Sequence, residues 1–360
     1  MRILAIDTSC DETAAAVTQD TNVLSNIIWS QASLHAKFGG ILPSLAQRMH
    51  QERIGWVINK ALVTSHQSLV TDIDAIAVTV GPGLGIALCV GIDKAKELAK
   101  KINKPLIPVN HVEGHLLGCF AKPRNSKSET LNSKQIQNSK IKFPSFGLVL
   151  SGGTTLLTLI NKIGKYKILA ETVDDALGEA LDKAARILGL GYPGGPILEK
   201  IARNGNPFAY PLPLPLKDDR IKNRFSYSGL KTAFVRLVES IKDPTKEQIC
   251  NLAASFQEVA FDHIINVLSF QITSHKSPVT SHFLLGGGVA CNITLRKKIR
   301  SLCKEKGLKL HLPYSKKLLT DNAGMVGVCG YLRTKNEELK TFTNYSQIDQ
   351  NPRLKITTSL

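Results

Sequence analysis

The sequence predicts an α/β protein made of two duplicated mixed-sheet domains with a cleft between them. The chain has 360 residues, which is more than one hydrophobic core usually organises. Its hydrophobic fraction of 43% is enough to fill two cores. The same order of elements, three short strands followed by alternating helices and strands, occurs twice along the chain.

The first copy covers residues 1–110. Short apolar segments separated by polar turns predict a meander of three strands, in 1–9, 13–19 and 22–31. The pattern then predicts a helix at about 45–63, a buried strand over 73–83, a helix over 84–102 and a short strand over 105–110. The strand over 73–83 ends in a Gly-Pro-Gly turn.

The second copy repeats this order. Strands are predicted over 145–153, 154–160 and 165–173, helices over 176–190 and 251–272, and a strand over 282–288 that a further helix and strand follow. Two such mixed sheets with their helices are the plan of actin, sugar kinases and Hsp70 (the ASKHA superfamily), which hold nucleotide phosphates between two hairpin tips.

The expected N-terminal subdomain combines residues 1–110 with 327–360, and the C-terminal subdomain covers 111–326. Residues 121–142 are polar, rich in Ser, Asn and Lys, and almost free of apolar side chains. Such a segment buries too little apolar surface to offset its ordering entropy. We therefore expect a flexible insertion there.

Composition limits the partners and the compartment. The 46 Lys and Arg against 29 Asp and Glu leave a net charge of +17, which suits a polyanion, although a general lysine bias explains it as well. The seven cysteines contain no CxxC pair, which favours reduced thiols in the cytoplasm. No apolar run reaches the roughly 18 residues that a membrane span needs, so no membrane partner is expected.

The segment NHVEGH places His111 and His115 four residues apart. On a helix this spacing puts both imidazoles on one face, where they can bind one metal ion together with an oxygen ligand from elsewhere. Surface histidine pairs without a metal are common. A zinc protease would carry its general-base Glu directly after the first His, whereas Glu113 lies two residues after it and faces another side of the helix.

Three glycine-rich segments each follow a predicted strand, and they begin at Gly81, Ser151 and Gly286. Turns without a Cβ let successive backbone N–H groups point at an anion, and a following helix adds its positive end. A single glycine-rich segment is explained better as a tight turn. Three such segments, at the ends of strands that face one cleft, favour a bound nucleotide.

Nine segments carry a more specific resemblance. They are IDTSCDETAAAV, FGGILPSLAQR, AVTVGPGLGIAL, NHVEGHLL, VLSGGTT, DDALGEALDKAARILGLGYPGGP, FSYSGLKTA, LLGGGVACNITLR and LLTDNAGM. In order and approximate spacing they resemble the tRNA threonylcarbamoyladenosine transferase family, called TsaD in bacteria. They cover nearly the whole chain.

This resemblance implies an acyl transfer to tRNA. The N6 amine of the adenosine next to the anticodon, in tRNAs that read ANN codons, would attack the carbamoyl carbon of threonylcarbamoyl-AMP, and AMP would leave. The resemblance also implies one divalent metal ion, expected to be Fe²⁺ with Zn²⁺ as the alternative. The implied partners are tRNA, a paralogous actin-like subunit (TsaB) and a P-loop ATPase subunit (TsaE).

The resemblance also assigns residues. The implied metal ligands are His111, His115 and Asp321. The residues implied to contact the adenylate are Val149, Leu150, Ser151, Gly152, Gly153, Asp182, Gly195 and Asn292. Asp11 and Glu12, at the tip of the first hairpin, are the nearest candidates for a general base or for a contact with threonine.

Two positions depart from the family pattern. Thr154 stands where the family usually has His, and Ser44 stands where it usually has Glu. Thr154 removes an imidazole from the edge of the phosphate loop, so a role of that side chain in proton transfer or metal orientation is in doubt. The three implied metal ligands are retained.

Structural interpretations exist beside these functional ones. Asp182 can pair with Arg186 one helical turn away, and Asn292 and Asp321 can cap helices. An ATP-dependent small-molecule kinase of the same fold is the alternative function, because fold alone does not fix function. Such a kinase would not need NHVEGH, and the retained site residues disfavour a non-enzymatic scaffold.

Overall fold

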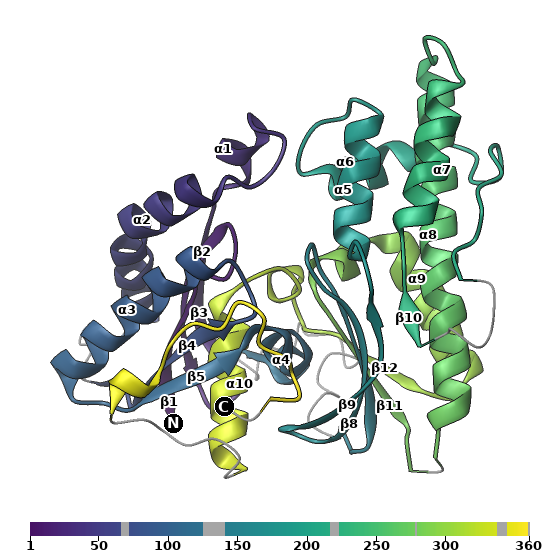
Figure 1. The fold of residues 1–360 in the computed structure, drawn as a ribbon. Helices are drawn as coiled ribbons and strands as arrows, with labels where there is room; N and C mark the ends of the chain where they lie inside the picture. Colours follow the sequence, from purple (N-terminus) through teal and green to yellow (C-terminus); the bar gives the residue numbers. More distant parts are fainter. Residues whose placement is uncertain (66–71, 125–140, 217–222, 278, 337–343, 359–360) are drawn as a thin grey trace.

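Two six-stranded sheets organise the protein, one in each half of the chain (Figure 1). The computed structural model describes residues 1–65, 72–124, 141–216, 223–277, 279–336 and 344–358. Each sheet packs helices on both faces, and a pair of central helices lies between the two sheets. This confirms the predicted α/β class.

The first sheet has the strand order β5-β4-β1-β2-β3-β6. Its strands are β1 (Arg2–Asp7), β2 (Glu12–Gln19), β3 (Asn22–Ser30), β4 (Ala75–Gly81), β5 (Leu106–Asn110) and β6 (Lys122–Pro123). The meander β1-β2-β3 is antiparallel, and β4 and β5 add in parallel beyond β1. Strands β1 and β4 are almost wholly buried apolar runs, as expected of parallel strands covered on both faces.

The second sheet has the order β10-β9-β8-β7-β11-β12. Its strands are β7 (Ser145–Leu150), β8 (Thr155–Lys162), β9 (Lys165–Thr172), β10 (Arg224–Phe225), β11 (His282–Gly286) and β12 (Lys309–His311). Strands β7, β8 and β9 form the antiparallel meander, and β11 and β12 add in parallel beyond β7. Apart from the edge strands β6 and β10, the five strands of each sheet follow the same order and directions. The predicted duplication is therefore confirmed.

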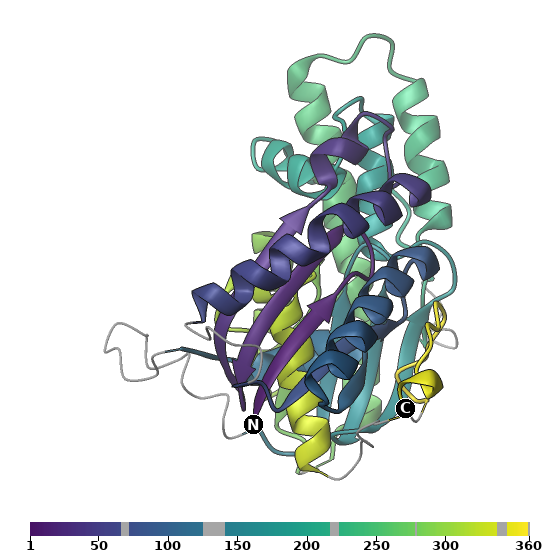
Figure 2. The ribbon, with the colours of Figure 1, turned by 90° about the vertical axis from the view of Figure 1, so that its left-hand side faces the viewer.

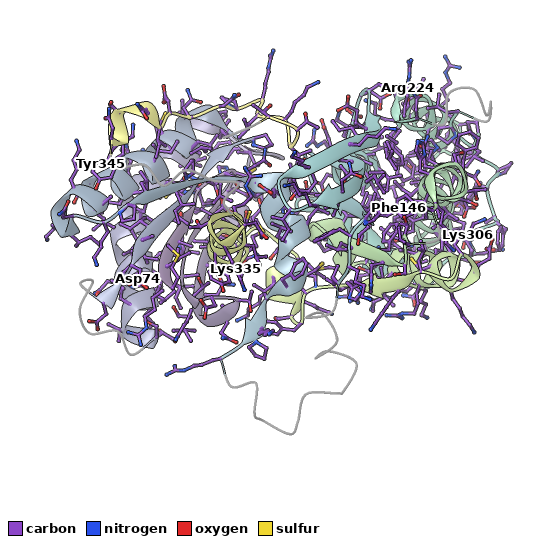
Figure 3. All side chains as sticks on the ribbon, turned by 90° about the horizontal axis from the view of Figure 1, so that it is seen from below. Asp74, Phe146, Arg224, Lys306, Lys335 and Tyr345 are labelled. Atoms are coloured by element: carbon purple, nitrogen blue, oxygen red, sulfur yellow. The ribbon has the colours of Figure 1, made fainter. Side chains whose placement is uncertain are left out.

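The remaining helices lie outside the central pair, and some of them pack on the outer faces of the sheets. In the first half they are α1 (Ala32–Ala36), α2 (Pro43–Thr64) and α3 (Gly85–Ile102). Helices α2 and α3 lie side by side across the first sheet (Figure 2). In the second half they are α5 (Leu177–Ile187), α6 (Gly194–Ala202), α7 (Ser228–Glu239), α8 (Lys246–His275) and α9 (Ile293–Glu305). The core between the second sheet and its helices contains Phe146 (Figure 3).

Two central helices connect the halves, and both follow the last parallel strand of a sheet. Helix α4 (His111–Leu117) follows β5 of the first sheet but packs on β7 and β11 of the second. Helix α10 (Ala323–Lys335) comes after β12 of the second sheet but packs on β1, β2 and β3 of the first. The two helices also contact each other (Figure 1). Each half therefore supplies a helix to the other.

The close approach of α10 to the first sheet depends on small residues. A Cβ on Gly327 would lie 2.7 Å from the side chain of the buried Thr18 and 3.3 Å from the Cβ of Ala5. A Cβ on Gly330 would lie 3.3 Å from the Cβ of Ala77. Alanines in the strands and glycines in the helix therefore let α10 lie against the sheet.

The exact division into subdomains stays a prediction. The boundary at residue 327 falls within α10, and Lys122–Pro123 of the expected insertion pairs with β3 of the first sheet. Residues 125–140 of that insertion lie outside the described residues. Among the residues that are described, each helix is too short or too polar to cross a membrane.

Replacing Gly327 with Ala should destabilise the protein although alanine favours helix. The new methyl group would lie 2.7 Å from the side chain of Thr18, which is fully buried, so the packing must shift and we expect a loss of about 1–3 kcal/mol of unfolding free energy. The matched control is Gly55→Ala in α2, where a Cβ meets nothing within 4 Å; it should stabilise by about 0.5–1 kcal/mol. Urea unfolding of both variants measures the difference, and equal effects would contradict the packing.

The stability of the second half should depend on pH through His263. Burial lowers its pKa from the usual 6.5 to about 4, against the charge of Asp174, and its Nε2 accepts the backbone N–H of Ser226 at 3.2 Å. Between pH 6.5 and about 4 the unfolded chain therefore binds more protons at His263 than the folded chain does. The stabilisation that neutral His263 gives to the folded state is complete above pH 6.5 and is lost as the pH falls towards 4.

The variant His263→Gln keeps an acceptor for Ser226 but cannot titrate. We expect its unfolding free energy to vary less between pH 7 and pH 5 than that of the unmodified protein, as measured by urea denaturation at about these two values. An identical pH dependence in both proteins would show that His263 does not contribute.

Candidate active site

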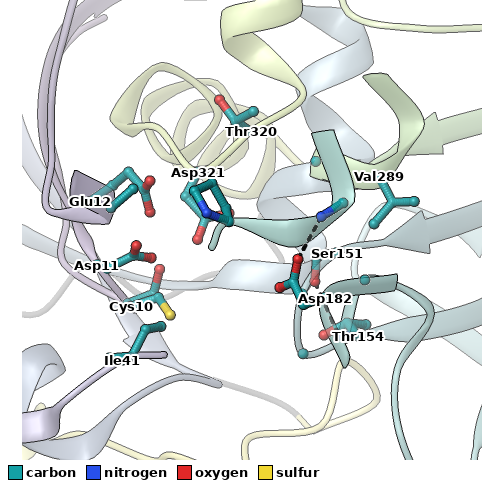
Figure 4. A pocket seen from close by; sticks show the side chains of 18 of the residues that line it. Cys10, Asp11, Glu12, Ile41, Ser151, Thr154, Asp182, Val289, Thr320 and Asp321 are labelled. Atoms are coloured by element: carbon teal, nitrogen blue, oxygen red, sulfur yellow. Dashed lines mark hydrogen bonds between the residues drawn. The ribbon is translucent and has the colours of Figure 1, made fainter. Parts of the chain in front are cut away.

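A cavity of about 670 Å³ opens between the two halves. The first half contributes the hairpin tip between β1 and β2, and the second half contributes the loops after β7 and β11 and the start of α6. Figure 4 shows Cys10, Asp11 and Glu12 on one wall, and Ser151, Thr154 and Asp182 on the opposite wall. Asp321 lies between the two walls (Figure 4).

Helix α4 holds two of the predicted residues rigidly. Asn110 ends β5 and caps the helix, because its side chain accepts the backbone N–H groups of Val112 and Glu113. His111 and His115 then lie one turn apart, with their ring centroids 4.7 Å from each other. His111 lines the cavity, and His115 is almost fully buried behind it.

Asp321 reaches the two histidines from the other central helix. It directly precedes the cap of α10, which is Asn322 and not Asp321 itself. Asp321 Oδ1 lies 3.2 Å from Nε2 of His115 and 3.5 Å from Nε2 of His111. The structure thus brings Asp321 beside two histidines that precede it by more than two hundred positions in the sequence.

These three side chains fit a divalent metal ion. Each of the three residues, which all belong to the described part of the chain, offers one ligand atom, and these three atoms lie within 4.8 Å of one another. Two ligands at about 2.1 Å from an ion in tetrahedral geometry lie about 3.4 Å apart, close to the spacing of Asp321 Oδ1 from each histidine. Nδ1 of His115 is buried without a hydrogen-bond partner, and its Nε2 has Asp321 as its neighbour, so a ligand at this histidine would compensate a buried polar atom.

The electrostatics of the cluster favour a positive charge. Burial lowers the pKa of His111, but Asp321 and Asp7 outweigh it and raise that pKa to about 10. Burial and the charge of His111 lower the pKa of His115. The nearby histidines hold the pKa of Asp321 below its usual range in spite of burial. The carboxylates can therefore hold a cation between them.

Sequence reasoning missed Asp7. It ends β1, is fully buried, and has Oδ2 at 3.7 Å from Nδ1 of His111. Its Oδ1 accepts the backbone N–H of Ser9 at 3.2 Å, and its Oδ2 has no hydrogen-bond partner. The sequence feature that could have identified Asp7 is its position as an acidic residue at the end of the apolar strand Arg2–Asp7. A carboxylate behind a histidine of this kind orients the imidazole.

All three glycine-rich segments border the cavity, at Gly83, at Ser151–Thr154 and at Gly288. Gly287 has φ 92° and a Cβ there would lie 2.3 Å from the carbonyl oxygen of Leu150, so only glycine fits. At the loop after β7, the carbonyls of Ser151 and Gly152 accept the N–H groups of Gly178 and Glu179 in the first turn of α5. Gly152 and Gly153 are exposed to the cavity.

Asp182 and Gly195 form one unit of the second wall. The N–H of Gly195, at the start of α6, donates to Oδ1 of Asp182 at 2.8 Å. Burial raises the pKa of Asp182, and the N–H groups of Gly195 and Gly194 act against this. Arg186 instead donates to the carbonyl oxygen of Gly39 in the other half. The side chain of Asp182 therefore closes α5 onto α6 and faces the cavity.

Asn292 has a structural role that the sequence allowed for. It caps α9 by accepting the N–H of Leu295 at 3.1 Å, and its amide nitrogen donates to Gln257 at 2.9 Å. It also lines the cavity. Val149 and Leu150 lie in β7 with fully buried side chains and do not line the cavity. Any adenylate contact of these two residues is limited to their backbone.

Asp11 and Glu12 lie on the wall opposite the glycine loops at Ser151–Thr154 and Gly288. Burial, Asp11 and Asp321 raise the pKa of Glu12 well above its usual value, and a hydrogen bond from Ser30 opposes this. Thr154 lines the cavity, whereas Ser44 is exposed in the first turn of α2. The departure at Thr154 therefore changes the cavity wall.

The fold and the site together indicate the class of protein to which this chain belongs. A duplicated actin-like fold with a cavity of glycine loops and a candidate metal cluster is typical of enzymes that handle a nucleotide between two domains. The crystal structure of full-length HypF in the phosphate- and nucleotide-bound form has the same fold, with a TM-score of 0.58 and 12% identity. That alignment covers 94% of this chain and 46% of the HypF chain, so this chain spans just under half of HypF.

The family follows from closer comparisons. The family model for tRNA N6-adenosine threonylcarbamoyltransferase (TsaD) matches residues 22–328. The protein of that name from Geotalea uraniireducens (strain Rf4) is 42% identical over 346 residues, which are 95% of this chain and 94% of that protein. The one from Thermosipho melanesiensis (strain DSM 12029 / CIP 104789 / BI429) is 43% identical over 332 residues, 92% of this chain and 94% of that protein. The chain belongs to this family.

Replacing His115 or Asp321 with Ala should abolish metal binding. Each change removes a ligand, and since even the loss of a supporting residue weakens a metal site by about 10–100-fold, we expect a loss of more than about 100-fold in affinity. Elemental analysis after anaerobic loading with Fe²⁺, or loading with Zn²⁺, measures it.

The matched control for this measurement is the variant His275→Ala. His275 is half-buried at the end of α8 and does not line the cavity. Full metal content in either ligand variant, or an equal loss in the control, would contradict the site.

Proposed function

We propose that this chain transfers the threonylcarbamoyl group from threonylcarbamoyl-AMP to the N6 amine of the adenosine next to the anticodon, in tRNAs that read ANN codons, with release of AMP. The observation that carries the proposal is the family match over most of the chain, together with the cavity in which the glycine loops meet the histidine pair. The match favours this transferase over the alternative, an ATP-dependent small-molecule kinase.

The glycine loops are proposed to hold the adenylate. Gly152 and Gly153 are exposed and line the cavity, and the backbone N–H groups of an open loop of this kind suit phosphate oxygens. The unit of Asp182 and Gly195 offers a carboxylate to the hydroxyl groups of a ribose, and Asn292 completes the same wall. These contacts would fix the acyl group in reach of the opposite wall.

His111, His115 and Asp321 are proposed to hold one divalent metal ion, with Fe²⁺ preferred and Zn²⁺ as the alternative. Such an ion, when bound, polarises phosphate or carbamoyl oxygens as a Lewis acid. Three protein ligands leave coordination positions open, as catalytic sites require. Asp7 would orient His111 from behind.

Asp11 and Glu12 are proposed to receive the proton that the adenosine amine loses. A carboxylate whose pKa is raised is a stronger base near neutral pH, and Glu12 has this property because it is buried beside other carboxylates. The two residues lie on the wall opposite the glycine loops at Ser151–Thr154 and Gly288. An adenine that enters between the walls would meet both the acyl group and the base.

The net charge of +17 supports tRNA as the acceptor, because Lys and Arg side chains neutralise phosphates. An unpaired base next to the anticodon can turn into a cavity at modest cost. We further propose a paralogous actin-like subunit (TsaB) and a P-loop ATPase subunit (TsaE) as partners, and the cytoplasm as the compartment. The free state of all seven cysteines is consistent with that compartment.

The test is a transfer assay with threonylcarbamoyl-AMP and a tRNA transcript, with and without the two partner subunits. Nucleoside mass spectrometry should detect threonylcarbamoyladenosine, and Glu12→Gln should lower the rate by about 100- to 10,000-fold if it is the base. A transcript with guanosine next to the anticodon is the matched substrate control. Phosphorylation of a sugar by ATP without any tRNA product would contradict the proposal.

A further inference from the structure

The hairpin tip that carries Asp11 and Glu12 is held through three consecutive carbonyl groups. The carbonyl oxygen of Ser9 accepts the N–H of Leu84 at 2.7 Å, and that of Asp11 accepts the N–H of Gln31 at 3.0 Å. Between them, the carbonyl oxygen of Cys10 lies 3.0 Å from Nε2 of His50. The three donors belong to three different segments of the first half, and one of them is a side chain.

His50 projects from α2 and is fully buried. Since a carbonyl oxygen can only accept, Nε2 of His50 must carry the hydrogen that it donates to Cys10. Its Nδ1 lies 2.8 Å from Oγ1 of Thr13 and, as the bare nitrogen of this tautomer, accepts the hydroxyl hydrogen. His50 therefore contacts the hairpin on both sides of Asp11 and Glu12.

A second buried network supports the other side of the tip. Gln31, whose N–H binds the carbonyl of Asp11, is itself fully buried and has its side-chain oxygen 3.1 Å from Nε2 of His35. Nδ1 of His35 accepts the N–H of Leu42 at 3.3 Å. Buried groups therefore hold the backbone of the tip on this side as well.

We propose that His50 is a positioning residue for the transfer reaction, which fixes the backbone of the hairpin tip so that the carboxyl groups of Asp11 and Glu12 face the adenosine amine. The inference rests on the proposed function, in which these carboxyl groups receive the proton. A displacement of about 1 Å in a reacting group can lower a rate by about 100-fold. The bond to Cys10 is the contact that matters for the reaction.

Two substitutions separate the two hydrogen bonds of His50. In His50→Gln the amide nitrogen lies near the position of Nε2 and can still donate to Cys10, whereas the bond to Thr13 is lost. In His50→Asn the amide oxygen lies near the position of Nδ1 and can still accept from Thr13, whereas the bond to Cys10 is lost. Each variant loses one bond, so we expect similar thermal midpoints.

We expect kcat of His50→Asn to fall by about 10- to 100-fold with KM for tRNA nearly unchanged, and kcat of His50→Gln to stay at least about tenfold above that of His50→Asn. Thr13→Val, which removes the other partner of His50, is the matched control and should resemble His50→Gln. Equal kcat values in the two His50 variants would overturn the proposal.

Cys10 gives a readout that does not depend on activity. It is half-buried at the tip, and its alkylation by iodoacetamide can be followed by peptide mass spectrometry, with the half-buried Cys89 as internal reference. A loosened tip should raise the labelling rate of Cys10 at least about threefold in His50→Asn and not in His50→Gln. Unchanged labelling in His50→Asn, or increased labelling with unchanged kcat, would overturn the proposal.

The two proposals fail in different ways. If the unmodified protein and its partners form no modified adenosine, the proposed function fails, and the labelling of Cys10 then decides alone whether His50 holds the tip. If the unmodified protein is active and both His50 variants match it, the proposed function stands and the role of His50 fails.

Discussion

The structure depends on a buried contact between the two central helices. Glu113 of α4 accepts from the hydroxyl of Tyr166 in β9 at 2.6 Å and lies 3.4 Å from Nη1 of Arg333 in α10. One carboxylate thus connects the second sheet, α4 and the helix that covers the first sheet. Burial raises the pKa of Glu113, and Arg333 and Tyr166 oppose this. Removing Arg333 would take the opposite charge away from the buried Glu113 carboxylate, and removing Tyr166 would take away one of its hydrogen bonds, so the three residues support one another.

This contact explains where the candidate metal site lies. Helices α4 and α10 are each capped by an asparagine, Asn110 and Asn322, and each carries a predicted ligand beside its cap. His111 directly follows one cap, and Asp321 directly precedes the other. Because the helices are exchanged between the halves, their first turns meet between the two sheets. The cluster therefore combines two side chains from the helix that follows the first sheet with one side chain from the segment that follows the second sheet.

The sequence predicted what local patterns determine. Apolar strands, helical periodicity and the duplicated order are confirmed by the two sheets, because they depend on neighbouring residues. Helices α6 and α7 were not predicted, since α6 begins within a run of Gly and Pro that reads as a turn. Asp7 and the partners of Glu113 escaped prediction because their contacts span distant segments. The roles of the site residues came from the family resemblance and stay predictions.

The distribution of charge gives the cavity a definite selectivity. The protein has a net charge of +17, yet Asp11, Glu12, Asp182 and Asp321 all line the cavity. On the proposed function, the net positive charge attracts the phosphates of an RNA backbone, and the four carboxyl groups repel phosphates from the cavity, which a neutral base can enter. An adenylate phosphate faces the same repulsion and needs the glycine N–H groups and a cation between the carboxylates. On the proposed function, the histidine pair and the glycine loops together allow an anionic substrate into an acidic cavity.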